Sequence, residues 1–320
     1  MVDMSIELFG LRFKNPVVLA SGPSGNGKEA MEVFDLAELG GFTTKTVTWK
    51  PECGNPPPRL VEIYGGVLNS IGLENGGFEY FVDKELPLLR DINTIKIVSV
   101  GGETIEEFAR MVEILNDIPY VDIIELNLSC PNVESGGVLF GKTSLLVRKI
   151  CERCKKVSSK KPLIVKLSPD VTDIVEIASE AVKGGIDGFT LINSVQGMKI
   201  NIEMGTPYFV RAVGGMSGPC IKPIGIWNVY QVRKAFPDIP IIGVGGIMSG
   251  EDAIEYIMAG ANVIGIGFGA MLDFDLPYRV IDGIEKFLKR HKCNSVKECY
   301  VGNKLTQMGT KQEEMLDDEC

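Results

Sequence analysis

The chain has 320 residues, of which 45% are hydrophobic, and its 33 Lys and Arg against 42 Asp and Glu give a net charge of -9. This negative charge argues against an electrostatic surface for nucleic acid or anionic membranes, and no apolar run approaches the ~20 residues of a membrane helix. The length suits one α/β barrel of roughly 250 residues with insertions. Eight dispersed cysteines without a secretory signal favour free thiols, so we expect a cytoplasmic protein.

Short apolar runs bounded by Gly, Pro, Asn or Ser predict a hairpin at 5–14 and then eight strands that alternate with helices. Strands are expected at 16–20, 42–47, 95–100, 123–127, 163–167, 188–192, 240–244 and 263–266. Helices are expected at 28–39, 78–89, 103–115, 144–157, 174–182 and 250–258, with Thr104 as an N-cap. Polar or glycine-rich residues follow the same end of each strand, which favours a (β/α)8 TIM barrel over a doubly wound sheet.

Two long insertions, at 50–77 and 195–223, interrupt this alternation. The first is expected to be a structureless loop, and such a long loop inside a compact domain is usually functional. We therefore expect the insertions to lie over the C-terminal face of the barrel. One domain is expected over 1–302, followed by a disordered acidic tail at 303–320.

The stretch 123–132 changes from a buried strand pattern to NLSCPN at 127–132, at the end of the strand where α/β barrels keep their catalytic groups. Asn127 and Asn132 could hold a planar polar substrate, and Cys130 between them could take a proton as a thiolate. Alternatively, the amides cap a turn and the thiol is a small buried hydrophobic group.

Glycine-rich turns follow the last two strands, at Gly245-Gly246 and at Gly267-Phe268. Barrels commonly bind a phosphate there through bare backbone N–H groups, although such glycines also make ordinary tight turns. Lys166, after the fifth strand, could be a Schiff-base nucleophile, a structural ion-pair partner, or a positive charge beside a flavin ring.

Three other features of the sequence contribute less to the prediction of function. Gly136, Gly137 and Gly141 predict a mobile lid after the fourth strand. The CxxC at 151–154 lies in a predicted helix without a second cysteine pair, so we expect a structural role and no metal site. The one histidine, His291, is expected at a helix end. Ser-His catalysis and metal binding by histidines are therefore disfavoured.

Several motifs together resemble class 1 dihydroorotate dehydrogenases over about residues 5–290. They are NLSCPN at 127–132, NSIGL at 69–73, KLSP at 166–169, GGMSGP at 214–219 followed by IKP at 221–223, and the turns at 245–246 and 267. The forms PDVTD at 169–173 and GGMSGP leading directly into IKP are similar to the class 1B catalytic subunit rather than the fumarate-using class 1A.

The resemblance implies a set of contacts in this chain. FMN would be held by Ser21, Lys45, Thr46, Ser99, Asn127, Lys166, Ile192, Gly218, Gly245, Gly246, Gly267 and Phe268, although Ser99 stands where the family is expected to have an Asn. Orotate would contact Lys45, Asn69, Ser70, Ile71, Gly72, Leu73, Asn127, Asn193 and Ser194. Cys130 matches the base that removes the C5 proton of (S)-dihydroorotate, with Lys45 also at the reacting centre, while the C6 hydride goes to the flavin.

The resemblance also implies partners. Class 1B enzymes pass electrons to NAD through a subunit that carries FAD and a [2Fe–2S] cluster. This chain has no Rossmann-type unit and no clustered cysteines, so that subunit would be a separate chain, in a heterotetramer built on a homodimer.

Four alternatives remain at the level of sequence, of which the first is a class 1A, fumarate-dependent dihydroorotate dehydrogenase. A dihydropyrimidine dehydrogenase-like enzyme shares the Asn-Leu-Ser-Cys-Pro core but acts on uracil or thymine. An aldolase-like lyase would use Lys166 as a Schiff-base residue and would be colourless. A non-catalytic phosphate-binding barrel would act as an assembly subunit and give no turnover.

Overall fold

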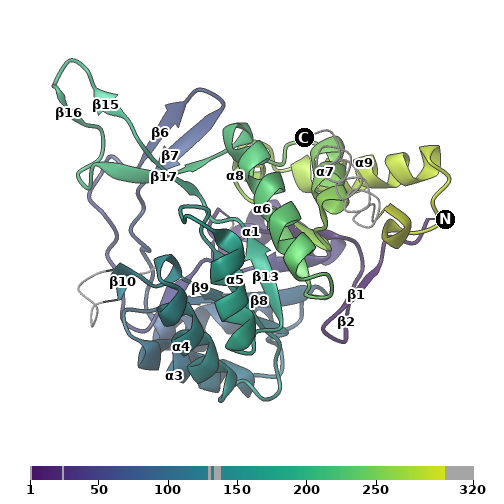
Figure 1. The fold of residues 1–320 in the computed structure, drawn as a ribbon, viewed down its shortest axis with the longest axis horizontal. Coiled ribbons are helices and arrows are strands. Elements are labelled where there is room, and N and C mark those ends of the chain that lie inside the picture. The colour runs from purple at the N-terminus through teal and green to yellow at the C-terminus, as the bar shows by residue number, and fades with distance from the viewer. Residues whose placement is uncertain (1, 24, 129–130, 133–137, 300–320) are drawn as a thin grey trace, which may run out of the picture.

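The computed structural model describes residues 2–23, 25–128, 131–132 and 138–299, and a closed parallel barrel of eight strands forms its centre (Figure 1). In hydrogen-bonded order the barrel strands are β4 (Gly41–Thr43), β3 (Val17–Leu19), β19 (Val263–Ile266), β18 (Ile241–Val244), β13 (Gly188–Leu191), β12 (Leu163–Leu167), β9 (Ile123–Asn127) and β8 (Ile95–Gly101). Pairing of β8 with β4 closes the ring. The predicted (β/α)8 barrel is confirmed.

Helices lie on the outside of the barrel, most of them between successive strands and the last two after the final strand (Figure 1). They are α1 (Lys28–Val33), α2 (Phe78–Tyr80), α3 (Ile105–Asn116), α4 (Ser144–Lys155), α5 (Ile174–Lys183), α6 (Lys222–Ala235), α7 (Gly250–Ala259), α8 (Phe268–Leu272) and α9 (Leu276–Arg290). Thr104 caps α3 as predicted, because its hydroxyl accepts a hydrogen bond from the Glu107 N–H at 3.2 Å. None of the helices in the described ranges is long and apolar enough to cross a bilayer.

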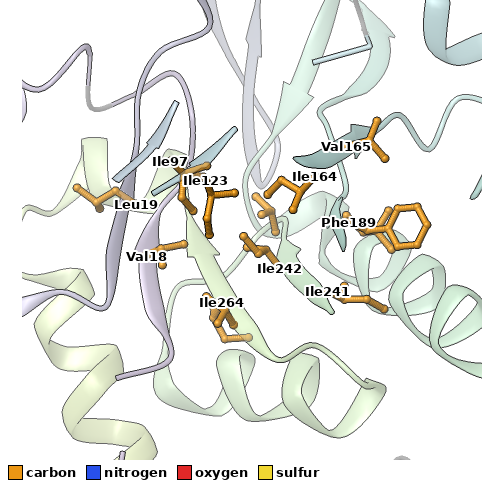
Figure 2. Packing of buried hydrophobic residues seen from close by; sticks show 14 of the residues in the cluster. Val18, Leu19, Ile97, Ile123, Ile164, Val165, Phe189, Ile241, Ile242 and Ile264 are labelled. Atoms are coloured by element: carbon orange, nitrogen blue, oxygen red, sulfur yellow. The ribbon is translucent and has the colours of Figure 1, made fainter. Parts of the chain in front are cut away.

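The N-terminal hairpin is present as β1 (Ile6–Leu8) and β2 (Leu11–Phe13). Aliphatic side chains fill the barrel because alternate residues of each strand point inward. Figure 2 shows Val18, Ile123 and Ile164 turned toward one another between the strands, whereas Val165 points away. All four are fully buried. This packing fixes the strand ends on which the polar residues stand.

The first insertion differs from its prediction, because it contains a regular hairpin rather than a structureless loop. β6 (Leu60–Ile63) and β7 (Gly66–Asn69) pair through the two-residue turn Tyr64-Gly65, where Gly65 has φ 75°. A positive φ suits glycine in a tight hairpin turn. β7 also pairs with β17 (Val213–Ser217), and β17 with β14 (Val195–Met198), so both insertions share one four-stranded sheet, here named the insertion sheet.

The expected strand at 42–47 is also interrupted. It forms β4, then a break at 44–46, then β5 (Val47–Thr48), and both pieces pair with β8. The break is held by Thr44, whose N–H donates to Ile97 O at 2.9 Å and whose hydroxyl accepts from the Ser99 N–H at 3.1 Å. Lys45 and Thr46 are thereby placed at the mouth of the barrel.

Two other helical segments are shorter than expected. α1 stops at Val33 because Phe34 is extended, and a separate 3-10 turn at Leu36–Glu38 is capped by Asp35, whose carboxylate accepts from the Ala37 N–H at 3.0 Å. After α2, the chain continues through a π-helical turn at Phe81–Glu85 and a 3-10 turn at Leu86–Leu89. The predicted tail at 303–320, and Gly136 and Gly137 of the predicted lid, lie outside the described residues.

Candidate functional site

A cavity of about 470 Å³ opens at the carboxyl ends of the barrel strands, beneath the insertion sheet. This volume lies in the range of small-molecule and cofactor sites. Sixteen of the residues that the sequence singled out line it: Ser21, Lys45, Thr46, Asn69, Ile71, Leu73, Asn127, Lys166, Ile192, Asn193, Ser194, Gly218, Gly245, Gly246, Gly267 and Phe268. Residues far apart in the chain therefore meet at one site, while their individual roles stay predictions.

A chain of side-chain hydrogen bonds crosses the cavity floor. Asn193 Nδ2 donates to Asn127 Oδ1 at 3.2 Å, and Asn127 Nδ2 donates to Thr46 Oγ1 at 2.9 Å. Thr46 Oγ1 lies 3.0 Å from Ser99 Oγ and 3.4 Å from Ser21 Oγ. These contacts hold two amide groups in fixed orientations at a cavity that could take a planar polar ligand.

Three predicted contacts lie behind the cavity wall. Ser99 is fully buried and reaches Thr46 rather than the cavity. Ser70 accepts a hydrogen bond from Asn55 Nδ2 at 2.9 Å, and a Cβ at Gly72 would lie 2.6 Å from the Asn55 nitrogen. Ser99 thus contacts Thr46, which lines the cavity, whereas Ser70 and Gly72 pack against Asn55, which does not.

Positive charge gathers at the cavity although the chain is acidic overall. Lys45 and Lys166 both line it, and Lys166 is 7% exposed. Arg59 and Glu74 lie at its edge and form an ion pair with an Nη1 to Oε2 distance of 2.6 Å. Behind Lys45, burial raises the pKa of Glu85 in spite of a hydrogen bond from Asn26 and the charge of Lys45. The cavity therefore suits an anionic ligand.

The glycine-rich turn after β18 requires glycine for its backbone conformation. Gly245 and Gly246 have φ values of 135° and 69°, which residues with a side chain rarely adopt. A Cβ at Gly246 would lie 2.7 Å from Gly218 O, and a Cβ at Gly218 would lie 2.6 Å from Gly66 Cα. The Gly218 backbone thus packs closely against both Gly66 and Gly246, and we call these three residues the glycine stack.

Gly267, after β19, has open space beside it. A Cβ there would meet only Ala20 Cβ, at 3.8 Å, and the residue lines the cavity. A side chain at this position would project into space that a ligand could occupy. Together with the turn at 245–246, this arrangement fits the phosphate of a nucleotide cofactor, which backbone N–H groups can bind directly.

The sequence interpretation missed Arg59 and Glu74. Besides the ion pair, Arg59 Nη2 donates to Cys53 O at 3.1 Å and Nε donates to Asn55 O. These bonds fold the insertion beside the cavity. The one available signal was the position of Arg59 in an insertion expected to cover the barrel.

Other sequence features lie away from the cavity or outside the description. Cys130, the predicted base, lies outside the described residues. Cys151 and Cys154 are buried in α4, where burial raises the pKa of both thiols, and within the described ranges neither belongs to a cluster of potential metal ligands. His291 stacks on Phe287 at the end of α9, with ring centroids 4.2 Å apart.

A family model described as Dihydroorotate dehydrogenase matches residues 3–288. The chain is 47% identical over 297 residues to the dihydroorotate dehydrogenase B (NAD(+)) catalytic subunit of Alkaliphilus metalliredigens, covering 93% of this chain and 97% of the relative. It is 46% identical to the corresponding subunit of Caldicellulosiruptor saccharolyticus, covering 94% and 99%. A relative from Aquifex aeolicus with the provisional name dihydroorotate dehydrogenase A (fumarate) is also 46% identical, covering 93% and 97%.

Proposed function

The chain belongs to the dihydroorotate dehydrogenase family, and from this premise we propose that it oxidises (S)-dihydroorotate to orotate in pyrimidine biosynthesis. The observation that supports this activity best is the cavity itself. It combines two oriented amides, two lysines and glycine-rich turns at the carboxyl ends of the barrel strands. A planar, anionic pyrimidine and a flavin phosphate match these groups in polarity and charge.

FMN is the cofactor we propose for the cavity. Gly245, Gly246 and Gly267 would hold its phosphate, because bare backbone can approach an anion that a Cβ would keep away. Lys166 would place a positive charge beside the flavin ring, which favours the anionic reduced form. When bound, FMN would accept the hydride that leaves C6 of dihydroorotate.

The chain's own residues would do the remaining chemistry. Lys45 would attract the substrate carboxylate, and Asn127 and Asn193 would hold the ring through donor and acceptor groups. Cys130 as a thiolate would remove the C5 proton, so that the C5–H electrons form the new C5–C6 double bond as the hydride departs. Cys130 enters this proposal from the sequence motif alone.

A separate electron-transfer subunit is proposed as the route to NAD. The relatives named as B-type are catalytic subunits, and the sequence interpretation places FAD and the [2Fe–2S] cluster in another chain. Met271 lines the cavity and is 47% exposed, next to the exposed Leu272 and Phe274. This apolar surface beside the cavity would suit a redox partner, which must approach the flavin closely.

We also propose a homodimer and a cytoplasmic location. Six exposed apolar residues lie on the segment 198–213, here named the arm: Met198, Ile200, Ile202, Met204, Val210 and Val213. The arm carries β15 (Ile200–Asn201) and β16 (Thr206–Pro207) and projects from the barrel in Figure 1. Exposed apolar groups of this kind favour a protein contact, and a second copy is the partner we assign.

The decisive experiment is the visible spectrum of the purified chain, followed by turnover assays. Oxidised-flavin bands and dye reduction that depends on dihydroorotate are expected, without NADH formation by the single chain. A colourless protein that becomes covalently linked to its substrate on treatment with borohydride would point to a lyase. Reduction of uracil or thymine without orotate binding would point to the dihydropyrimidine dehydrogenase-like activity, and strong fumarate turnover to the A type.

A further inference from the structure

We infer that Tyr256 on α7 is a positioning residue for the phosphate-binding turn at Gly245 and Gly246. Its side chain is fully buried, and its hydroxyl donates a hydrogen bond to Gly245 O at 2.7 Å. Tyr256 does not line the cavity. It acts from behind the turn, so the inference rests on the proposed FMN site and adds a residue that neither the motifs nor the family resemblance pointed to.

The space around Tyr256 is made by glycines on two other elements. A Cβ at Gly243, on β18, would lie 2.7 Å from Tyr256 Cδ1, and a Cβ at Gly225, on α6, would overlap the hydroxyl oxygen. A Cβ at Gly245 would lie 2.9 Å from the same oxygen. Three glycines therefore leave room for this one phenol ring to reach the turn from α7.

The hydrogen bond fixes which way the turn faces. A peptide group is planar, so holding the Gly245 carbonyl also holds the N–H of Gly246 in the same plane. Gly245 and Gly246 have positive φ values and no side chains to restrict them, so without an external contact many backbone conformations would be open to the turn. Packing against Gly218 restricts Gly246, and Tyr256 supplies the hydrogen bond that holds the Gly245 carbonyl and presets the turn for an anion.

Two flavins that differ only in the phosphate provide the test. FMN and riboflavin are titrated into full-length chain from which flavin has been removed, and binding is followed by flavin fluorescence. Wild type is expected to bind FMN much more tightly than riboflavin. Tyr256→Phe removes one hydroxyl and should weaken FMN binding roughly 3- to 10-fold, while riboflavin binding should stay nearly unchanged because riboflavin has no phosphate.

Tyr278→Phe is the matched control, because the Tyr278 hydroxyl accepts the Asp35 N–H at 2.7 Å away from the cavity. That variant should leave both affinities unchanged. Gly225→Ala is a second variant that keeps the tyrosine but displaces its hydroxyl, and it should give the same selective loss of FMN affinity.

Equal weakening of both flavins by Tyr256→Phe would make Tyr256 a residue of general packing and overturn the inference. Unchanged FMN affinity in both Tyr256→Phe and Gly225→Ala would overturn it as well. If wild type itself binds riboflavin as tightly as FMN, the phosphate site of the proposed function fails, and the inference falls with it for that separate reason.

Discussion

Thr46 is the residue on which the polar contacts of the cavity floor converge. Its hydroxyl accepts from Asn127 Nδ2, so its own proton is free to go to Ser99 or Ser21, and Ser99 is closer at 3.0 Å. The Asn127 carbonyl oxygen is then left facing Asn193, which donates to it at 3.2 Å. Thr46 lines the cavity, whereas Ser99 lies behind the cavity wall. Residues outside the cavity therefore help to set which donors and acceptors a ligand meets.

At the same scale, Cys130 is testable by removal of its thiol. Cys130→Ala should keep flavin and bind orotate but lose turnover by about 10²- to 10⁴-fold, the usual contribution of a positioned base. Cys130→Ser should recover part of the rate only at high pH, because a hydroxyl is the poorer base. Stopped-flow measurement of flavin reduction by dihydroorotate reports the step directly. A rate near wild type in the Ala variant would exclude Cys130 as the base.

Lys166 should be detectable in the redox properties of the flavin. Lys166→Ala removes a buried positive charge from the cavity, so the protein should retain FMN less well. The flavin potential should fall by on the order of tens of millivolts, since about 30 mV corresponds to 1.4 kcal/mol for two electrons. Spectroelectrochemical titration measures this shift. An unchanged potential would make Lys166 a structural residue.

At the scale of elements, an ion-pair network joins α6 to α7. Lys222 Nζ contacts Asp252 Oδ1 at 2.6 Å and Glu255 Oε1 at 2.8 Å, and Asp252 Oδ2 accepts from the Met248 N–H at 2.9 Å. Burial alone would raise the pKa of Asp252, but the hydrogen bonds from Lys222 and Met248 outweigh it and hold the pKa below 3.8. The network thus ties both helices to the loop after β18.

This network should give a pH-dependent part of the stability. Because the folded-state pKa of Asp252 is lowered, its contribution is present above pH 3.8 and is lost as the pH falls through the folded-state value. Asp252→Asn should reduce the free energy of unfolding by about 1–2 kcal/mol at neutral pH. The difference from wild type should shrink in denaturant titrations carried out toward about pH 3.

Asp282→Asn is the control for this prediction. Asp282 pairs with Lys286 at 2.5 Å on the exposed face of α9, where water screens the charges, so the pair should contribute little to stability. A loss for Asp252→Asn no larger than that of Asp282→Asn would contradict a stabilising network.

Elements with a strong local pattern could be predicted from the sequence, and those decided by distant partners could not. The barrel strands are continuous apolar runs, each followed by polar or glycine-rich residues. The order of the strands and the position of the site at their carboxyl ends therefore followed directly from the sequence. The β6–β7 hairpin was missed because apolar and polar residues do not alternate clearly along 60–69, and β7 is stabilised by β17, almost 150 residues away. Arg59 and Glu74 were missed because no local pattern marks a contact between two residues 15 positions apart.

At the scale of the whole molecule, the arm offers a test of self-association. Ile202 and Met204 are 84% and 71% exposed. Replacing both with Asp should weaken a dimer by roughly tenfold or more, because charges would be buried at an apolar contact. Light scattering across a concentration series measures the mass. Leu145→Asp, at an exposed apolar residue of α4, is the control and should remain dimeric. A wild-type chain that stays monomeric would exclude the dimer.

The glycine stack has a consequence for engineering new substrate specificity into this barrel. Gly66 belongs to the insertion sheet, Gly218 to the turn before α6, and Gly246 to the turn after β18, and the Gly218 backbone packs against the other two. The insertion sheet and the turn before α6 therefore cannot be exchanged for those of another barrel without affecting the turn at Gly245 and Gly246. A donor loop with a side chain at Gly218 would displace Gly66, and one with a side chain at Gly66 would displace Ser217 beside Gly218. Either change would disturb the packing of Gly218 against the turn at Gly245 and Gly246, so chimaeras should be screened for flavin retention before activity.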